Sequence, residues 1–191
     1  MKVLYVIIFC LSGFKAVYTQ EVVRVYSWDK VFNANPDTVY GIELSGRKLE
    51  TLPEALKKFT NLKVLDVSRN KLSQLPEFIE DYGSLEQLDI SRNKLEIFPL
   101  VITRVKTLKS LKANRNDFDR LPDAIRYNTQ LEYIDFWDTP VSGFPDGFFT
   151  LSELKKVDLS GIRFGPTFQR SLSERMPWVE FVMDEPCDCM E

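Results

Sequence analysis

The chain repeats itself every 23 residues, and this period constrains its fold more than any other feature of the sequence. Apolar residues recur at that spacing from residue 39 to residue 164 without an insertion. Three columns are Val39, Leu62, Leu85, Leu108, Leu131 and Leu154; Ile42, Leu65, Leu88, Leu111, Ile134 and Val157; and Leu44, Val67, Ile90, Ala113, Phe136 and Leu159. Six repeats in one register predict a stack of similar structural units.

Each repeat is predicted to contain one strand and one return arm. The segment LKVLDVSRNKLSQLP (62–76) begins with alternating apolar residues, the pattern of a strand with one buried face. A proline then ends strand pairing and can open a short helical turn at its first position. These prolines are Pro53, Pro76, Pro99, Pro122 and Pro145. Neither half of a repeat buries its apolar side alone, so neighbouring repeats must stack.

Stacking predicts an α/β solenoid that is curved, with a parallel concave sheet and short helical or irregular convex arms. Asn70, Asn93 and Asn116 lie where the chain leaves each strand. Their amides are expected to bond backbone groups of neighbouring turns that have lost strand partners. Thr139 takes this position in the fifth repeat and Pro140 follows it, so we expect a distorted turn there.

The pattern L-x-x-L-x-L-x-x-N-x-L-x-x-L-P-x-x-I over residues 39–164 resembles the leucine-rich repeat. Its 23-residue length and the phrase LDxSxNxLxxLP resemble the Ras-suppressor and Scribble type, whose eukaryotic members are intracellular. The ends of the chain, YSWDKVFNANPDTVYGIELSGRKLETLP (26–53) and MPWVEFV (176–182), instead resemble small secreted proteins of Bacteroidota. The resemblance implies a leucine-rich-repeat solenoid in an exported protein.

Residues 1–19 have the pattern of an export signal, with Lys2 followed by a mostly apolar stretch too short to span a bilayer. Val17 and Thr19 suit the −3 and −1 positions, which predicts cleavage before Gln20. An uncleaved N-terminal anchor and a lipidated Cys10 are the alternatives, and the bulky Phe9 disfavours lipidation. Export predicts a secreted, periplasmic or cell-surface protein with no stable membrane insertion after cleavage.

The segments outside the repeats are expected to cover the open ends of the core. Residues 20–38 form the predicted N-terminal cap, with a helix from an N-cap at Ser27 to about Asn33 and a stop at Asn35-Pro36. Residues 165–191 form the predicted C-terminal cap, with a helix over 166–176, a strand over 178–183 and a tail.

The composition argues against catalysis, a metal and a cofactor. The chain has no histidine, which removes the commonest general base and the commonest metal ligand. Cys187 and Cys189 belong to the tail, where a frayed end is favoured over a strained bridge or an incomplete zinc site. The formal net charge is −3, and loss of Lys2 and Lys15 with the leader makes it −5. This acidity disfavours nucleic acid as a partner.

The outward positions of the strands define the predicted concave face. One outward column is Glu43, Asp66, Asp89, Lys112, Asp135 and Asp158, and another is Gly46, Arg69, Arg92, Arg115, Asp138 and Gly161. Asp66 and Asp89 are expected to pair with Arg69 and Arg92 across the turn, which contributes only about 0–1 kcal/mol per exposed pair. Six strands about 4.8 Å apart give a wall roughly 24 Å wide, a size that suits a macromolecular partner.

Tyr133 and Trp137 break the outward pattern, because other repeats carry Gly, Ser, Gln or Asn at most of these positions. Together with arginine, such aromatics have the composition of a binding hot spot. The predicted partner-binding residues are Lys112, Asn114, Arg115, Tyr133, Asp135, Trp137 and Asp138. They predict a non-catalytic module that recognises a protein or peptide. Two alternatives remain: carbohydrate or cell-envelope binding through the two aromatics, and a Trp137 that folds inward or covers the gap at Thr139-Pro140.

Overall fold

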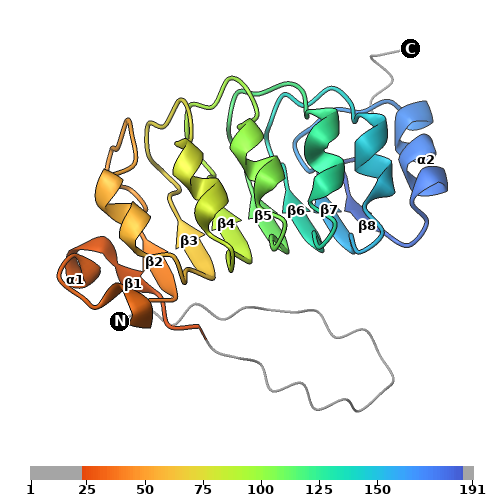
Figure 1. The fold of residues 1–191 in the computed structure, drawn as a ribbon. Coiled ribbons are helices and arrows are strands. Elements are labelled where there is room, and N and C mark those ends of the chain that lie inside the picture. Colours follow the sequence, from red (N-terminus) through yellow and green to blue (C-terminus); the bar gives the residue numbers. More distant parts are fainter. Residues whose placement is uncertain (1–22, 187–191) are drawn as a thin grey trace.

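The computed structural model describes residues 23–186, which form one curved solenoid (Figure 1). Eight strands make a single parallel sheet and follow one another in chain order. They are β1 (Tyr26–Ser27), β2 (Gly41–Glu43), β3 (Val64–Asp66), β4 (Gln87–Asp89), β5 (Ser110–Lys112), β6 (Tyr133–Asp135), β7 (Lys156–Asp158) and β8 (Glu180–Val182). The predicted fold class is confirmed. The expected leader (1–19), Cys187 and Cys189 lie outside the described residues.

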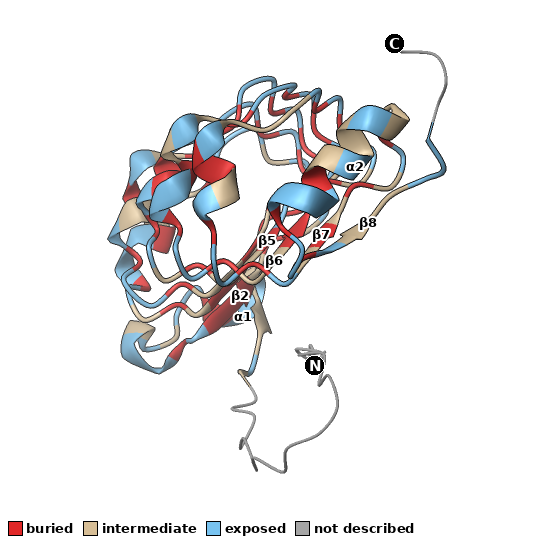
Figure 2. Ribbon diagram, turned by 90° about the vertical axis from the view of Figure 1, so that its right-hand side faces the viewer, coloured by how far each residue is buried: buried red, intermediate tan, exposed pale blue. Residues whose placement is uncertain are grey.

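The 23-residue period of the sequence is also the register of the sheet. Leu88 pairs with Leu65 on one side and with Leu111 on the other, and the same offset holds from β2 to β7. The middle residue of each of these three-residue strands points inward and is buried. Figure 2 shows buried residues both along the strands and on the arms.

The return arms are short 3-10 helices on the side of the solenoid opposite the sheet (Figure 1). After the cap they are η2 (Glu54–Lys58), η3 (Glu77–Asp81), η4 (Leu100–Arg104), η5 (Asp123–Tyr127) and η6 (Asp146–Thr150). The prolines that recur every 23 residues lie just before these helices and not at their first position. The carbonyl of each proline accepts the first hydrogen bond of its helix. Leu56, Ile79, Ile102, Ile125 and Phe148 pack inward and are fully buried.

The asparagine column forms the predicted ladder of hydrogen bonds. Asn93 Nδ2 donates to Val67 O at 3.1 Å and to Ile90 O at 2.9 Å, while its Oδ1 accepts from Leu72 N at 3.1 Å. Val67 O also accepts from Asn70, and Ile90 O also accepts from Asn116. Each side chain therefore ties its own turn to the preceding one, which satisfies buried backbone groups outside the strands.

The turn at Thr139 keeps the left-handed residue of its neighbours but not all of their hydrogen bonds. Thr139 N donates to Phe136 O at 3.2 Å, and Pro140 has no N–H for the bond that Asp117 N makes to Leu95 O. Asp138 has φ 54°, close to the 52° of Arg115 and the 56° of Arg92. Thr139 Oγ1 donates to Phe136 O at 2.8 Å, a bond that asparagine makes in the other repeats. The threonine hydroxyl replaces the donor of the asparagine amide but not its acceptor oxygen. Within residues 23–186, Phe118 N has no partner of the kind that Leu95 N finds in Asn116.

The N-terminal cap differs from the prediction in three respects. Tyr26 and Ser27 form an unpredicted strand, β1, which extends the sheet by pairing with β2. Helix α1 (Trp28–Val31) begins after Ser27 as expected, but the Ser27 side chain makes no capping bond and the helix ends before Asn33. Asn35-Pro36 opens the 3-10 helix η1 (Pro36–Thr38) instead of only stopping a helix, because Asn35 Oδ1 accepts from Asp37 N.

At the C-terminal end, α2 (Pro166–Arg175) and β8 match the expected helix and strand closely. Buried Leu172 and Met176 cover the apolar end of the last repeat. With β1 and β8 included, the sheet has seven inter-strand steps and spans about 34 Å instead of the expected 24 Å. Within residues 23–186, no helix has the length and apolar character required to cross a bilayer.

Candidate functional site

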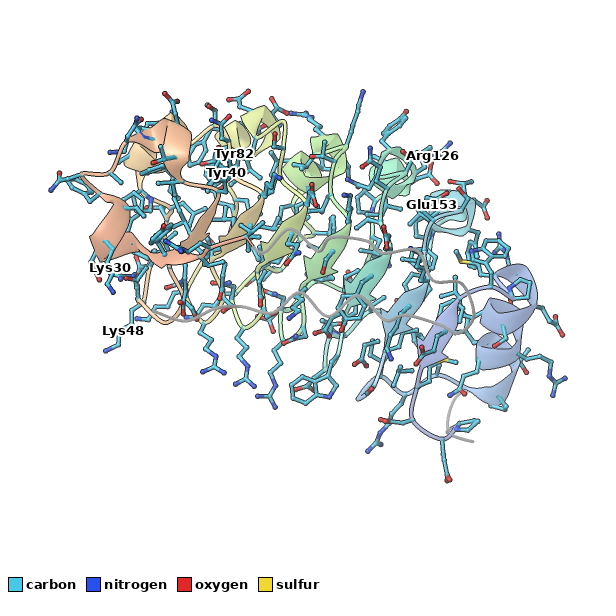
Figure 3. All side chains as sticks on the ribbon, turned by 90° about the horizontal axis from the view of Figure 1, so that it is seen from below. Lys30, Tyr40, Lys48, Tyr82, Arg126 and Glu153 are labelled. Carbon is cyan, nitrogen blue, oxygen red and sulfur yellow. The ribbon has the colours of Figure 1, made fainter. Side chains whose placement is uncertain are left out.

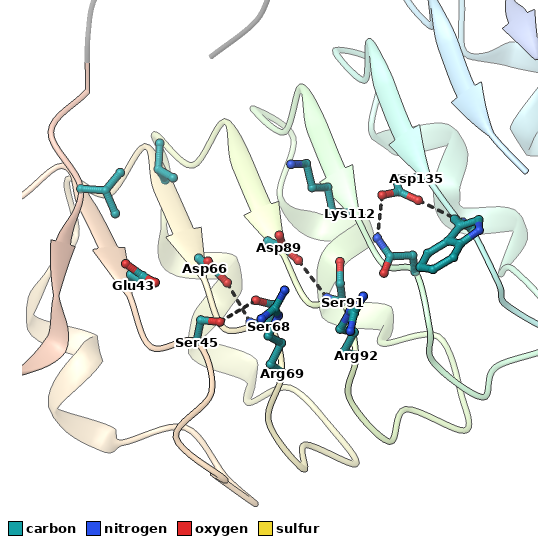
Figure 4. A pocket seen from close by; sticks show the side chains of 14 residues that line it. Glu43, Ser45, Asp66, Ser68, Arg69, Asp89, Ser91, Arg92, Lys112 and Asp135 are labelled. Carbon is teal, nitrogen blue, oxygen red and sulfur yellow. Dashed lines mark hydrogen bonds between the residues drawn. The ribbon is translucent and has the colours of Figure 1, made fainter. Parts of the chain in front are cut away.

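A groove of about 420 Å³ runs along the concave wall, the outward face of the sheet, from β2 to β6 (Figure 4). Four carboxylates line it, from Glu43, Asp66, Asp89 and Asp135. Because β2 to β6 pair in register, these side chains and Lys112 form one row across the strands. Figure 3, seen from below, places Tyr40 and Lys48 at opposite margins of the sheet, just before and shortly after β2.

The aspartates of the row fix the turn that follows each strand. Asp66 Oδ1 accepts from Ser68 N at 2.9 Å, and Asp89 Oδ1 accepts from Ser91 N at 2.9 Å. Asp135 and Asp158 make the same bond to the residue two positions on. The chain then enters the left-handed region at Arg69 and Arg92, both at φ 56°, and these arginines are exposed. Neither forms the ion pair expected with Asp66 or Asp89, so that prediction is wrong.

Burial makes the groove carboxylates harder to ionise. Desolvation raises the pKa of Asp89 above its usual value, and the neighbouring Asp66 carboxylate raises it further. The bond from Ser91 N and the charge of Lys112, which faces Asp89 on β5, oppose these effects without cancelling them. Burial also raises the pKa of Asp135, against the bonds from Trp137 N and Asn114. The floor of the groove therefore holds carboxyl groups whose ionised form is destabilised mainly by burial.

We expect Asp89→Asn to raise the free energy of unfolding at pH 7 by about 0.2–1 kcal/mol, the size of a cross-strand like-charge effect. The amide oxygen still accepts from Ser91 N, while the repulsion from Asp66 disappears. Because the folded-state pKa of Asp89 is raised, ionisation of Asp89 destabilises the fold. Protonation removes this destabilisation from the wild type as the pH falls through that pKa. Urea unfolding of both proteins should therefore show a difference at pH 7 that shrinks toward pH 4. A constant or inverted difference would contradict the electrostatic explanation.

Trp137 forms the far end of the groove, on the turn after β6. It is half-buried on the outward face and is not part of the buried core, so the inward alternative is wrong. The Arg115 guanidinium lies 4.2 Å from the centroid of its ring, and Arg115 Nε pairs with Asp138 Oδ2 at 3.0 Å. These two contacts hold the indole in one orientation at modest energetic gain.

The seven predicted site residues lie on two adjacent repeats, but not in one patch. Lys112, Asn114, Asp135 and Trp137 line the groove, and Asn114 Nδ2 donates to Asp135 Oδ2 at 2.6 Å. Arg115 and Asp138 flank it through their contacts with the indole and with each other. Tyr133 is half-buried at the start of β6, four residues before Trp137, and is not among the lining residues. Burial raises the pKa of its phenol, which stays neutral at physiological pH.

Sequence reasoning did not assign the other end of the groove as a site. This end is lined by Glu43, Asp66 and Asp89, by Ser45, Ser68 and Ser91, and by Val25 and Val64. All but Val25 belong to the outward columns, whose aspartates and serines resemble ordinary repeat residues. Val25 comes from the cap, which the repeat period does not describe. Within residues 23–186, no cluster of three or more acidic or cysteine side chains is placed to hold a metal.

Comparisons with known proteins agree with this architecture. Residues 39–95 match the leucine-rich repeat family. The structure is similar to that of an internalin from Listeria monocytogenes, with a TM-score of 0.64 at 15% sequence identity over 80% of this chain. The chain folds as a leucine-rich-repeat solenoid. This solenoid covers 43% of the internalin and thus spans less than half its length. A comparison with curated proteins finds no match.

Proposed function

We propose that this leucine-rich-repeat solenoid is a non-catalytic module that binds a protein or peptide through its concave wall. The observation that carries the proposal is the position of Trp137 at one end of the groove, held between Arg115 and the turn of its own strand. Tryptophan and arginine are the residues most often found at interface hot spots. An indole that is already oriented loses little conformational freedom on binding, which favours affinity.

The size of the wall supports a macromolecular partner. Its eight strands span about 34 Å, more than the six repeats alone would give, and strand length adds the second dimension. A standard interface needs about 800 Å² from each partner. The groove is open along the wall and mainly polar, whereas small-molecule sites are concave and mostly apolar.

We further propose that the module acts outside the cytoplasm, in a secreted, periplasmic or cell-surface protein. The export pattern of residues 1–19 supports this location. The resemblance of the chain ends to small secreted Bacteroidota proteins agrees with it, although the repeats themselves resemble the Ras-suppressor and Scribble type. Detection of a mature chain that begins at Gln20 in the exported fraction would support the proposal, and an intact leader in the cytoplasm would contradict it.

A displayed peptide library selected on the immobilised chain tests the recognition role. We expect selected peptides to lose at least about 30-fold in affinity for the Tyr133→Ala/Trp137→Ala variant, since truncation of one hot-spot residue costs about 2 kcal/mol or more. The matched control is Tyr127→Ala/Trp178→Ala, which removes one tyrosine and one tryptophan that are 58% and 51% exposed, on η5 and beside β8. Full binding by a folded wall variant, or equal loss in the control, would contradict the proposal.

Carbohydrate or cell-envelope binding through Tyr133 and Trp137 is the alternative. Aromatic rings bind sugars by offering an open face. Here Arg115 covers one face of the indole, and Tyr133 does not line the groove with Trp137, so we favour a peptide ligand. A glycan array read with the same two double variants decides the matter. Glycan binding that only the wall variant loses would replace our proposal with this alternative.

A further inference from the structure

We propose that the acidic end of the groove, formed by Asp66, Asp89 and Ser91, is a subsite for a basic side chain of the partner, with arginine favoured over lysine. This inference rests on the proposed recognition function and specifies the chemistry of its ligand. It concerns a different part of the wall from Trp137. Ser91 and Trp137 hold the same position in repeats two apart, which places them about 10 Å from each other.

The Ser91 hydroxyl points to a missing ligand. Ser91 is only 5% exposed and lines the groove, yet its Oγ has no hydrogen-bond partner within residues 23–186 (Figure 4). Equivalent serines are satisfied, because Ser45 Oγ bonds Ser68 Oγ at 3.0 Å and Ser160 Oγ donates to Asp158. A buried hydroxyl without a partner costs free energy, and a bound donor would remove that cost.

The two carboxylates beside Ser91 form no ion pair with another described residue. Asp66 and Asp89 lie directly opposite each other on β3 and β4, about 4.8 Å apart in the sheet, and both are half-buried. Each uses Oδ1 for a backbone bond in its own turn, which leaves the second oxygen for a guest. Like charges at facing strand positions repel, and the raised pKa of Asp89 reflects this together with its burial.

The cations that line the groove do not neutralise this pair. Arg69, Arg92 and Lys112 are exposed, and none of them forms an ion pair with Asp66 or Asp89. Lys112 faces Asp89 on β5 and lowers its pKa, but burial and the Asp66 carboxylate outweigh this effect. Water and salt screen exposed charges far more than half-buried ones. A cationic guest between Asp66 and Asp89 would therefore stabilise their ionised forms more than the exposed cations do.

Guanidinium matches the arrangement of acceptors best. It is planar and carries five N–H donors in a fixed fork, so it can donate to carboxylates on two neighbouring strands and to Ser91 Oγ at once. Lysine offers a single ammonium point charge. A calcium ion prefers six to eight oxygen ligands, and the described residues provide no cluster of three acidic side chains placed for a metal.

Titration of the ¹⁵N-labelled chain with N-acetyl-argininamide tests the subsite directly. We expect saturable shifts of the Asp89 and Ser91 amide signals, and no such shifts with N-acetyl-citrullinamide, which has nearly the same shape but no charge. Asp66→Asn and Asp89→Asn should each weaken binding about tenfold, because a charge-assisted bond is lost while the backbone bond stays. Ser91→Ala should weaken binding several-fold.

Asp158→Asn is the matched control, since Asp158 makes the same turn bond to Ser160 N but does not line the groove. It should bind argininamide as wild type does. Absence of shifts at Asp89 and Ser91, equal shifts with citrullinamide, or an unchanged affinity in Asp89→Asn would overturn the subsite. Binding of Ca²⁺ at these residues in competition with argininamide would overturn the choice of guanidinium.

Failure of this inference is distinguishable from failure of the recognition proposal. Peptides that bind through Trp137 while argininamide leaves Ser91 unaffected would refute the subsite and support the module. Argininamide binding at Ser91 without any peptide that depends on the wall aromatics would support the subsite and refute the module. Selected peptides that carry arginine, and lose affinity with both Asp89→Asn and the aromatic double variant, are the result we expect.

Discussion

Leu88→Ala is expected to lower the free energy of unfolding by about 2–5 kcal/mol. Leu88 is 1% exposed in the middle of β4, between Leu65 and Leu111 on the neighbouring strands. The strands and arms around it are held in register by stacking on both sides, so the space left by the side chain can collapse only partly. The loss therefore combines the transfer free energy of the removed atoms with that of a cavity. Urea unfolding followed by circular dichroism measures it.

Gln87→Ala is the control for this change, because Gln87 neighbours Leu88 on the same strand but faces outward. We expect it to change stability by no more than about 0.5 kcal/mol. Equal effects of the two substitutions would mean that the inward column does not carry the core. A solenoid stabilised by nearest-neighbour stacking should also lose cooperativity when a central repeat is weakened.

Asn93→Ala is expected to cost about 2–4 kcal/mol, although it removes no apolar contact of the core. The substitution leaves Leu72 N without its acceptor, and it removes one of the two donors to each of Val67 O and Ile90 O. A buried polar group without a hydrogen-bond partner destabilises the folded state by the full cost of its desolvation. The same unfolding measurement tests the loss, and the exposed Lys94→Ala beside it serves as control.

Thr139→Asn is the reciprocal change and should stabilise the chain by about 0.5–1.5 kcal/mol. Its amide can keep the bond to Phe136 O and give Phe118 N the acceptor that threonine does not provide. Destabilisation by Asn93→Ala without any gain from Thr139→Asn would show that Phe118 N finds water instead. No effect of either substitution would remove the ladder as a source of stability.

The architecture could be predicted because one local pattern determines both the strand and its neighbours. A residue such as Leu65 is buried only if Ile42 and Leu88 stack on either side of it, so the 23-residue spacing gives the sheet register directly. The 23-residue spacing does not predict the cap strand β1. Its signal is Gly41, where a Cβ would lie 2.9 Å from Val25 Cγ2 and 3.1 Å from Arg24 O. Glycine there permits the close approach of the cap.

The candidate site was predicted less completely, because charge pattern alone does not fix side-chain partners. Asp66 and Arg69 have opposite charge three residues apart, yet the aspartate bonds Ser68 N and the arginine follows a left-handed backbone away from it. Aspartate commonly bonds the backbone two residues on in this way. The sequence drew attention to the aromatic end of the groove because Trp137 departs from its column. The acidic end did not stand out in the sequence, because its residues are the usual ones of their columns.

The most direct test of the central claim is to map a selected peptide on the chain by ¹⁵N chemical-shift perturbation. We expect the shifted amides to lie on the outward side of the wall, at residues 66–68, 89–91, 112–114 and 135–137, with Trp137 Nε1 among the largest changes. The convex helices η2 to η5 should stay unperturbed. Shifts concentrated on those helices, with the wall unchanged, would contradict recognition through the concave face.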